Sequence, residues 1–201
     1  MTLNKIVVGN LEVNCYILST KSNKAIIIDP GEDFFKIDNF IKKKKLEPVF
    51  IINTHGHIDH IGADENFKLP VYIHSRDAEC LSNAGKNLSS FLGSPYSFNA
   101  QIKSVEDKDN IKLEELSLEV IHTPGHTPGG ICLKCDDFIF TGDTLFREGI
   151  GRTDFPGASS QDLLQSINKK LLVFPDRVKI YPGHGPDSTI GHEKKHNPFL
   201  S

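Results

Sequence analysis

The sequence lacks the features of membrane and secreted proteins. None of its apolar runs approaches the roughly 20 residues that cross a bilayer, so we expect no transmembrane span. The N-terminus has no long apolar stretch before a small-residue cleavage site, so we also expect no signal peptide. Only four cysteines occur in 201 residues, which does not indicate a disulfide framework and makes a reducing cytoplasm the expected compartment.

A surplus of positive charge is also missing. The chain has 23 Lys and Arg against 26 Asp and Glu, a net charge of −3, and so lacks the basic excess typical of nucleic-acid-binding proteins. What is present is a globular mixture, 38% hydrophobic and 24% charged, which argues against intrinsic disorder. We find no repeat, low-complexity segment or linker, and therefore predict one domain over residues 1–201.

Short apolar runs predict strands that are interspersed with a few helices. The predicted strands are residues 6–8, 13–18, 25–28, 49–52, 71–73, 116–121, 131–133, 138–140 and 178–181. Helices are predicted at 33–45, 61–68, 75–81 and 159–172, with a short one before Pro198. The polar segment 82–101 is predicted to be a long loop, which either lines a binding cleft or is an ordinary connection.

Histidine stands out, because nine are present and most fall in short glycine-containing clusters. Each cluster follows a predicted strand, and strand ends are held rigidly by a sheet while glycine allows close backbone approach. Five imidazoles and two carboxylates gathered in this way exceed what a pocket can pair internally, whereas a transition metal binds both. Taken singly, each cluster could be an ordinary solvated turn. The clusters are His55-Gly56-His57-Ile58-Asp59-His60, Pro124-Gly125-His126, Gly142-Asp143 and Pro182-Gly183-His184.

The spacing within the first cluster indicates two metal sites served by one loop. His55 and His57 are two residues apart, so at an extended strand end they point the same way. Asp59 and His60 follow where the chain turns, and they can face a neighbouring position. The complete string, followed in order by the later clusters, therefore favours a metal centre over isolated turns.

Three features taken together resemble one known family. They are Thr54-His55-Gly56-His57-Ile58-Asp59-His60, the later clusters in their order, and Asp29-Pro30-Gly31. The family is the metallo-β-lactamase superfamily, and the resemblance covers nearly the whole chain. It implies an α+β fold, a four-layer αββα sandwich with the metals at one edge of its two sheets. It also implies a first metal on His55, His57 and His126, a second on Asp59, His60 and His184, and Asp143 bridging both.

Within this superfamily the chain is most similar to the glyoxalase II-like hydrolases (hydroxyacylglutathione hydrolases), in their short single-domain bacterial branch. The matching segments are 122–129, 141–146, 181–185 and Asn197-Pro198-Phe199. The resemblance implies a hydrolase in which a hydroxide bridging two divalent metals attacks a thioester. Asp59 would bind one metal and orient this hydroxide. We expect zinc, while iron or manganese would also suit these ligands.

The sequence departs from glyoxalase II where that family binds glutathione. Glyoxalase II has a C-terminal helical domain that contributes basic groups to glutathione, and we expect none here because the chain stops at Ser201. Arg152 and Asp154 stand where the family has a Lys and a Tyr that contact glutathione, and Pro186 stands where it has another Tyr. The resemblance therefore supports the reaction more strongly than the thiol carrier.

Two arginines in a glycine-rich loop are candidates for substrate binding. The planar guanidinium of Arg147 or Arg152 suits the carboxylate of an acidic substrate. The alternative is an internal ion pair, such as Arg152 with Asp154. For His122, four residues before His126, we predict a supporting or turn hydrogen bond rather than a metal bond.

Three other functions stay open at this point. A mononuclear-iron persulfide dioxygenase shares the fold, resembles the chain at 151–155 and would use only His55, His126 and Asp143. The presence of all the second-site ligands favours the hydrolase. The others are a lactonase or β-lactamase-like hydrolase and a non-catalytic, metal-stabilised binding module. We expect a small-molecule substrate, no nucleic acid or membrane, and a monomer or small homo-oligomer.

Overall fold

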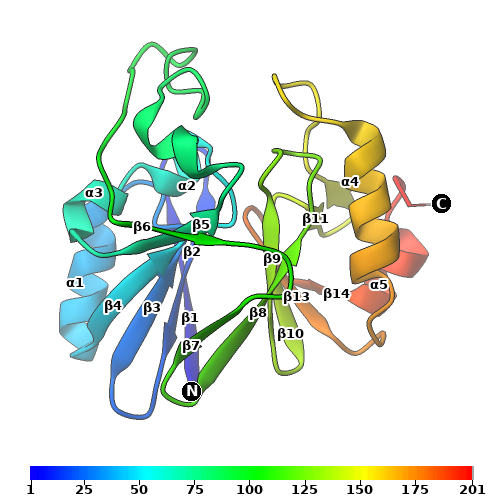
Figure 1. Ribbon diagram of the computed structural model, residues 1–201. Coiled ribbons are helices and arrows are strands. Elements are labelled where there is room, and N and C mark those ends of the chain that lie inside the picture. Colours follow the sequence, from blue (N-terminus) through cyan, green and yellow to red (C-terminus); the bar gives the residue numbers. More distant parts are fainter. Residues whose placement is uncertain (201) are drawn as a thin grey trace.

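Two six-stranded sheets form the centre of the computed structural model, which describes residues 1–200. Figure 1 shows the sheets side by side, with helices on the outer side of each. The first sheet has the order β1 (Thr2–Val8), β2 (Val13–Ser19), β3 (Lys24–Ile28), β4 (Glu47–Ile52), β5 (Val71–His74) and β6 (Ile102–Val105). The second has the order β14 (Ser188–Thr189), β13 (Lys179–Pro182), β10 (Phe138–Gly142), β9 (Ile131–Cys135), β8 (Leu116–His122) and β7 (Asn110–Leu113). A small separate sheet pairs β11 (Leu145–Phe146) with β12 (Gly149–Ile150).

Helices cover the outer side of each sheet (Figure 1). The first sheet is flanked by α1 (Phe34–Lys44), α2 (Ile58–Ile61), α3 (Asp64–Phe67) and the 3-10 helix η1 (Ala78–Ser82). The second is flanked by α4 (Ser160–Ser166), the π-helix η2 (Ile167–Leu171) and α5 (Ile190–His196). Within residues 1–200, none of these helices combines the length and the apolar character that a membrane crossing needs.

Both faces of the central strands are buried, which explains why their sequences are continuously apolar. Along β2, Tyr16 and Leu18 point into the space between the sheets, because successive side chains alternate across a strand. Cys15 and Ile17 point the other way, toward the outer helices. Burying both faces in this manner requires a layer on each side of the sheet.

Three apolar clusters separate the four layers. The middle cluster joins the two sheets and includes Phe50 and Phe140. One outer cluster packs the first sheet against Ile37 and Ile41 of α1, and the other packs the second sheet against Leu163 of α4. The predicted four-layer αββα sandwich is therefore confirmed, whereas the assignment of the whole chain to one domain stays a prediction.

Two predicted helices are shorter in the structure than in the sequence analysis. The predicted helix at 61–68 contains only the last residue of α2 and the four-residue α3, separated by a turn at Gly62 and Ala63. Gly62 packs so closely on the preceding loop that an added Cβ would lie 2.6 Å from the Gly31 carbonyl oxygen. Residues 75–81 form only the 3-10 helix η1. Close packing of the loops near the histidine cluster thus overrides the helical pattern here.

The predicted helix at 159–172 is α4 continued by η2, so its second half has π-helical rather than α-helical hydrogen bonds. Ser159 caps its start, because its hydroxyl accepts a hydrogen bond from the Asp162 N–H. The long loop expected at 82–101 lies between η1 and β6. Strand β6 has no clear sequence signal, since only Val105 of its four residues is buried.

Loops that carry the histidine clusters leave one edge of the two sheets. Strands β3, β4, β5 and β6 run parallel, and β10 runs parallel to β13, so their carboxyl ends lie at the same edge. The first histidine cluster follows β4, Asp143 follows β10, and His184 follows β13. A β-bridge between Val13 and His184 joins the two sheets at this edge. The topology therefore brings clusters from both halves of the chain together.

Candidate metal centre

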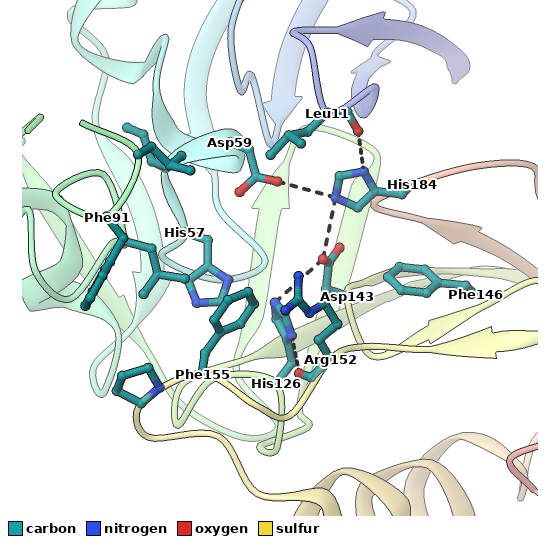
Figure 2. Close-up of a pocket in the computed structure, with 14 residues that line it drawn as sticks. Leu11, His57, Asp59, Phe91, His126, Asp143, Phe146, Arg152, Phe155 and His184 are labelled. Atoms are coloured by element: carbon teal, nitrogen blue, oxygen red, sulfur yellow. Dashed lines mark hydrogen bonds and ion pairs between the residues drawn. The ribbon is translucent and has the colours of Figure 1, made fainter. Parts of the chain in front are cut away.

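All seven predicted donor residues meet where these loops converge. Their ligand atoms form three triplets, and within each triplet all atoms lie within 4.8 Å of one another. We call the first triplet the three-histidine group and the second the aspartate group. They consist of His55, His57 and His126, and of Asp59, His60 and His184. The third triplet, His55, His60 and Asp143, contains one member of each group. Figure 2 shows five of the donors around one cavity.

Asp143 contacts both groups. Its Oδ2 lies 3.6 Å from Nε2 of His126 and 3.5 Å from Nε2 of His184, and its Oδ1 lies 3.4 Å from Nε2 of His60. The loop after β13 leaves room for this carboxylate only because residue 183 is glycine, since an added Cβ would collide with Asp143 Oδ1. One carboxylate is thus shared between two sets of donors.

The three-histidine group presents uncharged nitrogen donors. His55 and His57 are buried, and burial together with repulsion between neighbouring imidazoles lowers the pKa of both side chains, that of His57 to about 3. Nδ1–H of His126 donates to the carbonyl oxygen of Arg152 at 2.8 Å. This bond leaves Nε2 of His126 as the nitrogen that faces the cluster.

The aspartate group is held together by ion pairs. Burial alone would lower the pKa of His60, but the carboxylates of Asp143, Asp59 and Asp29 raise it to about 10. Burial alone would raise the pKa of Asp59, but His60 and His184 hold it well below its usual range. Nδ1–H of His184 donates to a backbone carbonyl in the β1–β2 turn, which aims Nε2 at Asp59, 3.4 Å from Oδ2. The donors of this group therefore pair with one another.

The chemistry of the cluster fits divalent transition metals. Imidazole nitrogen and carboxylate oxygen are the ligands that zinc, iron and manganese share. Nε2 of His55, Nε2 of His126 and Oδ1 of Asp143 are buried and have no hydrogen-bond partner among the described residues. A buried polar atom without a partner costs free energy, and metal ions bound by this cluster would supply partners for these atoms. The His and Asp cluster can therefore hold divalent metal ions.

Asp29 supports the aspartate group from behind. Its carboxylate accepts hydrogen bonds from the Thr54 N–H at 2.8 Å and the Thr54 hydroxyl at 2.7 Å, and it pairs with Nδ1 of His60 at 3.0 Å. The imidazole of His60 is thereby turned with Nε2 toward the cluster. The sequence marks Asp29 only as part of Asp29-Pro30-Gly31, and no local pattern reveals its partner.

Asp77 supports the three-histidine group and has no sequence signal at all. The side chain is buried and accepts hydrogen bonds from the Gly56 N–H at 3.1 Å, the Thr127 hydroxyl at 2.6 Å and the Gly129 N–H at 2.7 Å. Its burial raises the pKa of the carboxyl, although these hydrogen bonds oppose the shift. Asp77 thus joins the loop of His55 and His57 to the loop of His126.

A cavity of about 620 Å³ opens onto the donors. His57, Asp59, His126, Asp143 and His184 line one part of it (Figure 2). Much of the remaining wall is apolar, formed by Leu11, Leu88, Phe91, Leu92, Phe146 and Phe155. Phe91 and Leu92 belong to the long loop at 82–101, so one of the two expectations for this loop, a cleft-lining role, is met.

The two predicted substrate-binding arginines occupy different places. Arg152 lines the cavity, but its guanidinium binds Asp154 through two hydrogen bonds of 3.0 and 2.7 Å. Arg147 is not among the lining residues, and its Nε lies 3.8 Å from the carboxylate of Glu148. Both guanidinium groups thus have an acidic neighbour within the chain, as the alternative interpretation of the sequence held.

His122 lies outside the donor cluster, as expected. Its Nε2–H donates to the carbonyl oxygen of Pro128 at 3.0 Å, which is the turn hydrogen bond predicted for this residue. Its ring stacks on His74 with the centroids 4.0 Å apart and the planes 16° from parallel. His74 ends β5 and His122 ends β8, so the stack joins the two sheets near the metal centre.

Comparison with known proteins identifies relatives along the whole chain. The Metallo-beta-lactamase superfamily profile matches residues 8–184. A protein of Bacillus subtilis named probable metallo-hydrolase YqgX is 36% identical over 100% of this chain and 98% of its own length. A protein of Haemophilus influenzae named hydroxyacylglutathione hydrolase GloC is 34% identical over 100% of this chain and 99% of its own length.

Solved structures show the same fold. The crystal structure of BLEG-1 B3 metallo-beta-lactamase superposes with a TM-score of 0.94 at 36% identity and covers 100% of both chains. TTHA1623, solved in a di-iron-bound form, superposes with a TM-score of 0.86 at 34% identity and covers 98% of this chain and 100% of its own. The chain therefore belongs to the metallo-β-lactamase superfamily and has the fold and the donor cluster of a metallo-hydrolase.

Proposed function

We propose that this chain is a metal-dependent hydrolase that cleaves thioesters with two divalent metal ions, zinc being the expected metal. The three-histidine group would hold one ion, the aspartate group the other, and Asp143 would contact both. The observation that carries the proposal is this pair of donor sets, joined by one carboxylate at the wall of a cavity. The di-iron form of TTHA1623 supports two ions, and the name of GloC supports a thioester.

The residues of the cavity leave water as the nucleophile. None of the lining residues in the described part of the chain is Ser, Thr, Cys or Lys, so no side chain there can form an acyl intermediate of the usual kinds. Cys80 does not line the cavity, and burial raises the pKa of its thiol to about 12. Divalent metals supply the remaining chemistry, since they polarise a carbonyl and lower the pKa of water from 15.7 toward about 7.

Asp59 is the residue that we propose orients the attacking water. Its carboxylate lines the cavity, and its lowered pKa keeps it ionised and able to accept a hydrogen bond from water. The water oxygen forms the new bond to the carbonyl carbon, the carbon–sulfur bond breaks, and the thiolate leaves. One proton of the water passes to the leaving thiolate and the other to solvent, so the products are a carboxylate and a thiol.

A mononuclear-iron dioxygenase would use only His55, His126 and Asp143. That alternative gives no role to the aspartate group, whose three donor atoms are gathered within 4.8 Å beside the same cavity. We therefore favour the hydrolase. We further propose a cytoplasmic enzyme with a small-molecule substrate, acting as a monomer or small homo-oligomer; the four free cysteines agree with a reducing compartment.

The proposal is tested by metal analysis of the protein as purified, without added metal or chelator, and by hydrolysis of S-lactoylglutathione. We expect about two zinc ions per chain and a loss of roughly a thousandfold in kcat/KM for His57→Ala and Asp59→Asn. His196→Ala is the matched control, because His196 is exposed and lies outside the cluster. One iron per chain with consumption of oxygen, or unchanged hydrolysis in both folded variants, would contradict the proposal.

A further inference from the structure

The cavity wall divides into two chemically different parts. Five lining residues are donors of the metal centre, and all but one of the others are apolar. The exception is Arg152. A site that recognised a substrate through several carboxylates would need several cationic or hydrogen-bonding side chains at these positions. The wall instead offers a large apolar surface next to the metal centre.

The guanidinium of Arg152 is already paired within the chain. Nε and Nη2 of its guanidinium donate to the two carboxylate oxygens of Asp154. This bidentate ion pair balances the positive charge of Arg152. The same guanidinium lies 4.5 Å from the centroid of the Phe155 ring, where it adds a cation–π contact. Arg152 therefore contacts both Asp154 and Phe155, and its charge is matched within the chain.

Phe155 connects the apolar wall to the metal centre. Its ring meets the rings of His57 and His126 nearly edge-on, with centroids 5.5 and 6.2 Å apart. Figure 2 shows Phe155 beside these two donors and Phe91 on the same side of the cavity. A carbonyl held at the three-histidine group thus has an aromatic surface directly beside it.

The outer part of the wall is apolar and exposed to solvent. The side chains of Phe91 and Leu92 are 72% and 64% exposed, although both belong to the cavity. Large apolar side chains left in solvent at the mouth of a cavity are typical of a surface that becomes covered by a ligand. The ligand that fits is apolar at this end and carries its reacting carbonyl at the other.

We propose that the substrate is a thioester with an apolar acyl group, which packs against Phe155, Phe91 and Leu92; the inference rests on the thioesterase function proposed above. Biological thiol carriers such as glutathione are charged, so the apolar part of such a substrate is its acyl group. The acyl chain lies along the apolar wall, and the carrier extends from the cavity into solvent. Specificity therefore comes from the acyl group and not from the carrier.

Two series of thioesters test this inference on zinc-loaded protein. One carries acetyl, butanoyl, hexanoyl and octanoyl groups on N-acetylcysteamine, a small uncharged thiol, and the other carries the same groups on glutathione. We expect kcat/KM to rise about fourfold per added methylene, equivalent to about 0.8 kcal/mol, until the cavity is filled. The glutathione esters are expected to be no better substrates than the matching uncharged esters.

Variants at the opening of the cavity test which residues cause the dependence of kcat/KM on acyl length. In Phe91→Ser/Leu92→Ser, kcat/KM for the octanoyl ester falls by about tenfold or more relative to kcat/KM for the acetyl ester of the same variant. Phe35→Ser is the matched control, because Phe35 is 76% exposed and does not line the cavity. Calorimetric binding of octanoate to the same proteins gives a second readout, with weaker binding expected only in the double variant.

The outcomes separate this inference from the function on which it rests. Absence of hydrolysis for every ester of both series would overturn the thioesterase proposal itself. Hydrolysis that does not depend on acyl length, or a preference for S-lactoylglutathione over the octanoyl esters, would overturn the inference alone. Equal octanoate binding by the double variant and Phe35→Ser would do the same.

Discussion

The three-histidine group and the aspartate group lie side by side, yet their electrostatic surroundings are opposite. In the first, burial and repulsion from the neighbouring imidazole of His126 lower the pKa of His57 to about 3, and the carboxylate of Asp59 only partly opposes them. In the second, His60 is equally inaccessible, but three carboxylates around it raise its pKa to about 10. The comparison shows that burial alone does not determine whether a histidine is protonated, because neighbouring charges decide whether its pKa rises or falls.

The groups also differ in what a metal ion must displace. Nε2 of His55 and Nε2 of His126 have no hydrogen-bond partner among the described residues, so a cation meets free lone pairs there. In the aspartate group, Nε2 of His184 lies 3.3 Å from Nε2 of His60 and 3.4 Å from Oδ2 of Asp59, and these contacts must be exchanged for metal bonds. The three-histidine group is thus better prepared to bind a metal ion than the aspartate group.

The largest expected effect is therefore a difference in metal affinity between the groups. Calorimetric titration of metal-free protein with zinc should show two steps, with the first at least about a hundredfold tighter, or about 2.8 kcal/mol. His57→Ala should remove the tighter step and His184→Ala the weaker one. If the titration showed both zinc ions binding in one step, or if His57→Ala lost the weaker step, the two groups would not differ in metal affinity as expected. His196→Ala serves as the control.

A smaller effect is expected from the two supporting carboxylates. Asp77→Asn should weaken zinc binding to the three-histidine group, and Asp29→Asn binding to the aspartate group, each by about 10- to 100-fold. The reason is that Asp77 positions the loops of the three-histidine group and Asp29 positions the ring of His60, although neither carboxylate is among the metal donors. The same titration measures both variants, and thermal unfolding of the metal-free proteins checks that they fold. If each variant weakened both steps equally, the two groups would not be separately supported.

The smallest effect concerns the stack of His74 on His122, which joins the two sheets. Burial and the nearby His122 and Arg76 lower the pKa of His74 to about 4, while Glu106 and Asp107 oppose this shift. Between the usual histidine pKa of about 6.5 and this value, the unfolded chain binds a proton that the folded chain does not. The free energy of unfolding should therefore fall as pH decreases from 6.5 toward 4.

His74→Asn tests this pH dependence, because an asparagine oxygen can replace Nδ1 as acceptor for the Arg76 N–H without titrating. Denaturant unfolding of the metal-free protein at pH 4 to 7 should give a shallower decline for the variant than for the unaltered chain. Identical slopes for the two proteins would show that His74 does not carry a depressed pKa.

The strands and the donors could be predicted because both are encoded locally. An apolar run such as Val49–Ile52 indicates a buried strand, and His or Asp directly after it indicates a loop at the sheet edge. His55 and His57 belong to one group as their spacing predicted, with ring centroids 4.7 Å apart, although the chain bends after Ile52 instead of staying extended.

The supporting residues could not be predicted, because their partners are distant in sequence. Asp77 binds Thr127 and Gly129, which are 50 and 52 residues further along the chain. Asp29 binds His60 across 31 residues. The apolar role of Phe91 was hidden for a related reason, since a loop rich in polar residues shows no periodicity that reveals which side chain faces a cavity.

The β-bridge between Val13 and His184 has a wider consequence for the molecule. The first sheet comes from residues up to Val105 and the second from Asn110 onward, so the donors are divided between the two halves of the chain. Neither half alone could coordinate an ion in the manner proposed. Each bound cation would cross-link the two sheets at the edge where the donors meet. Removal of the metal would therefore destabilise the packing of one sheet on the other at this edge.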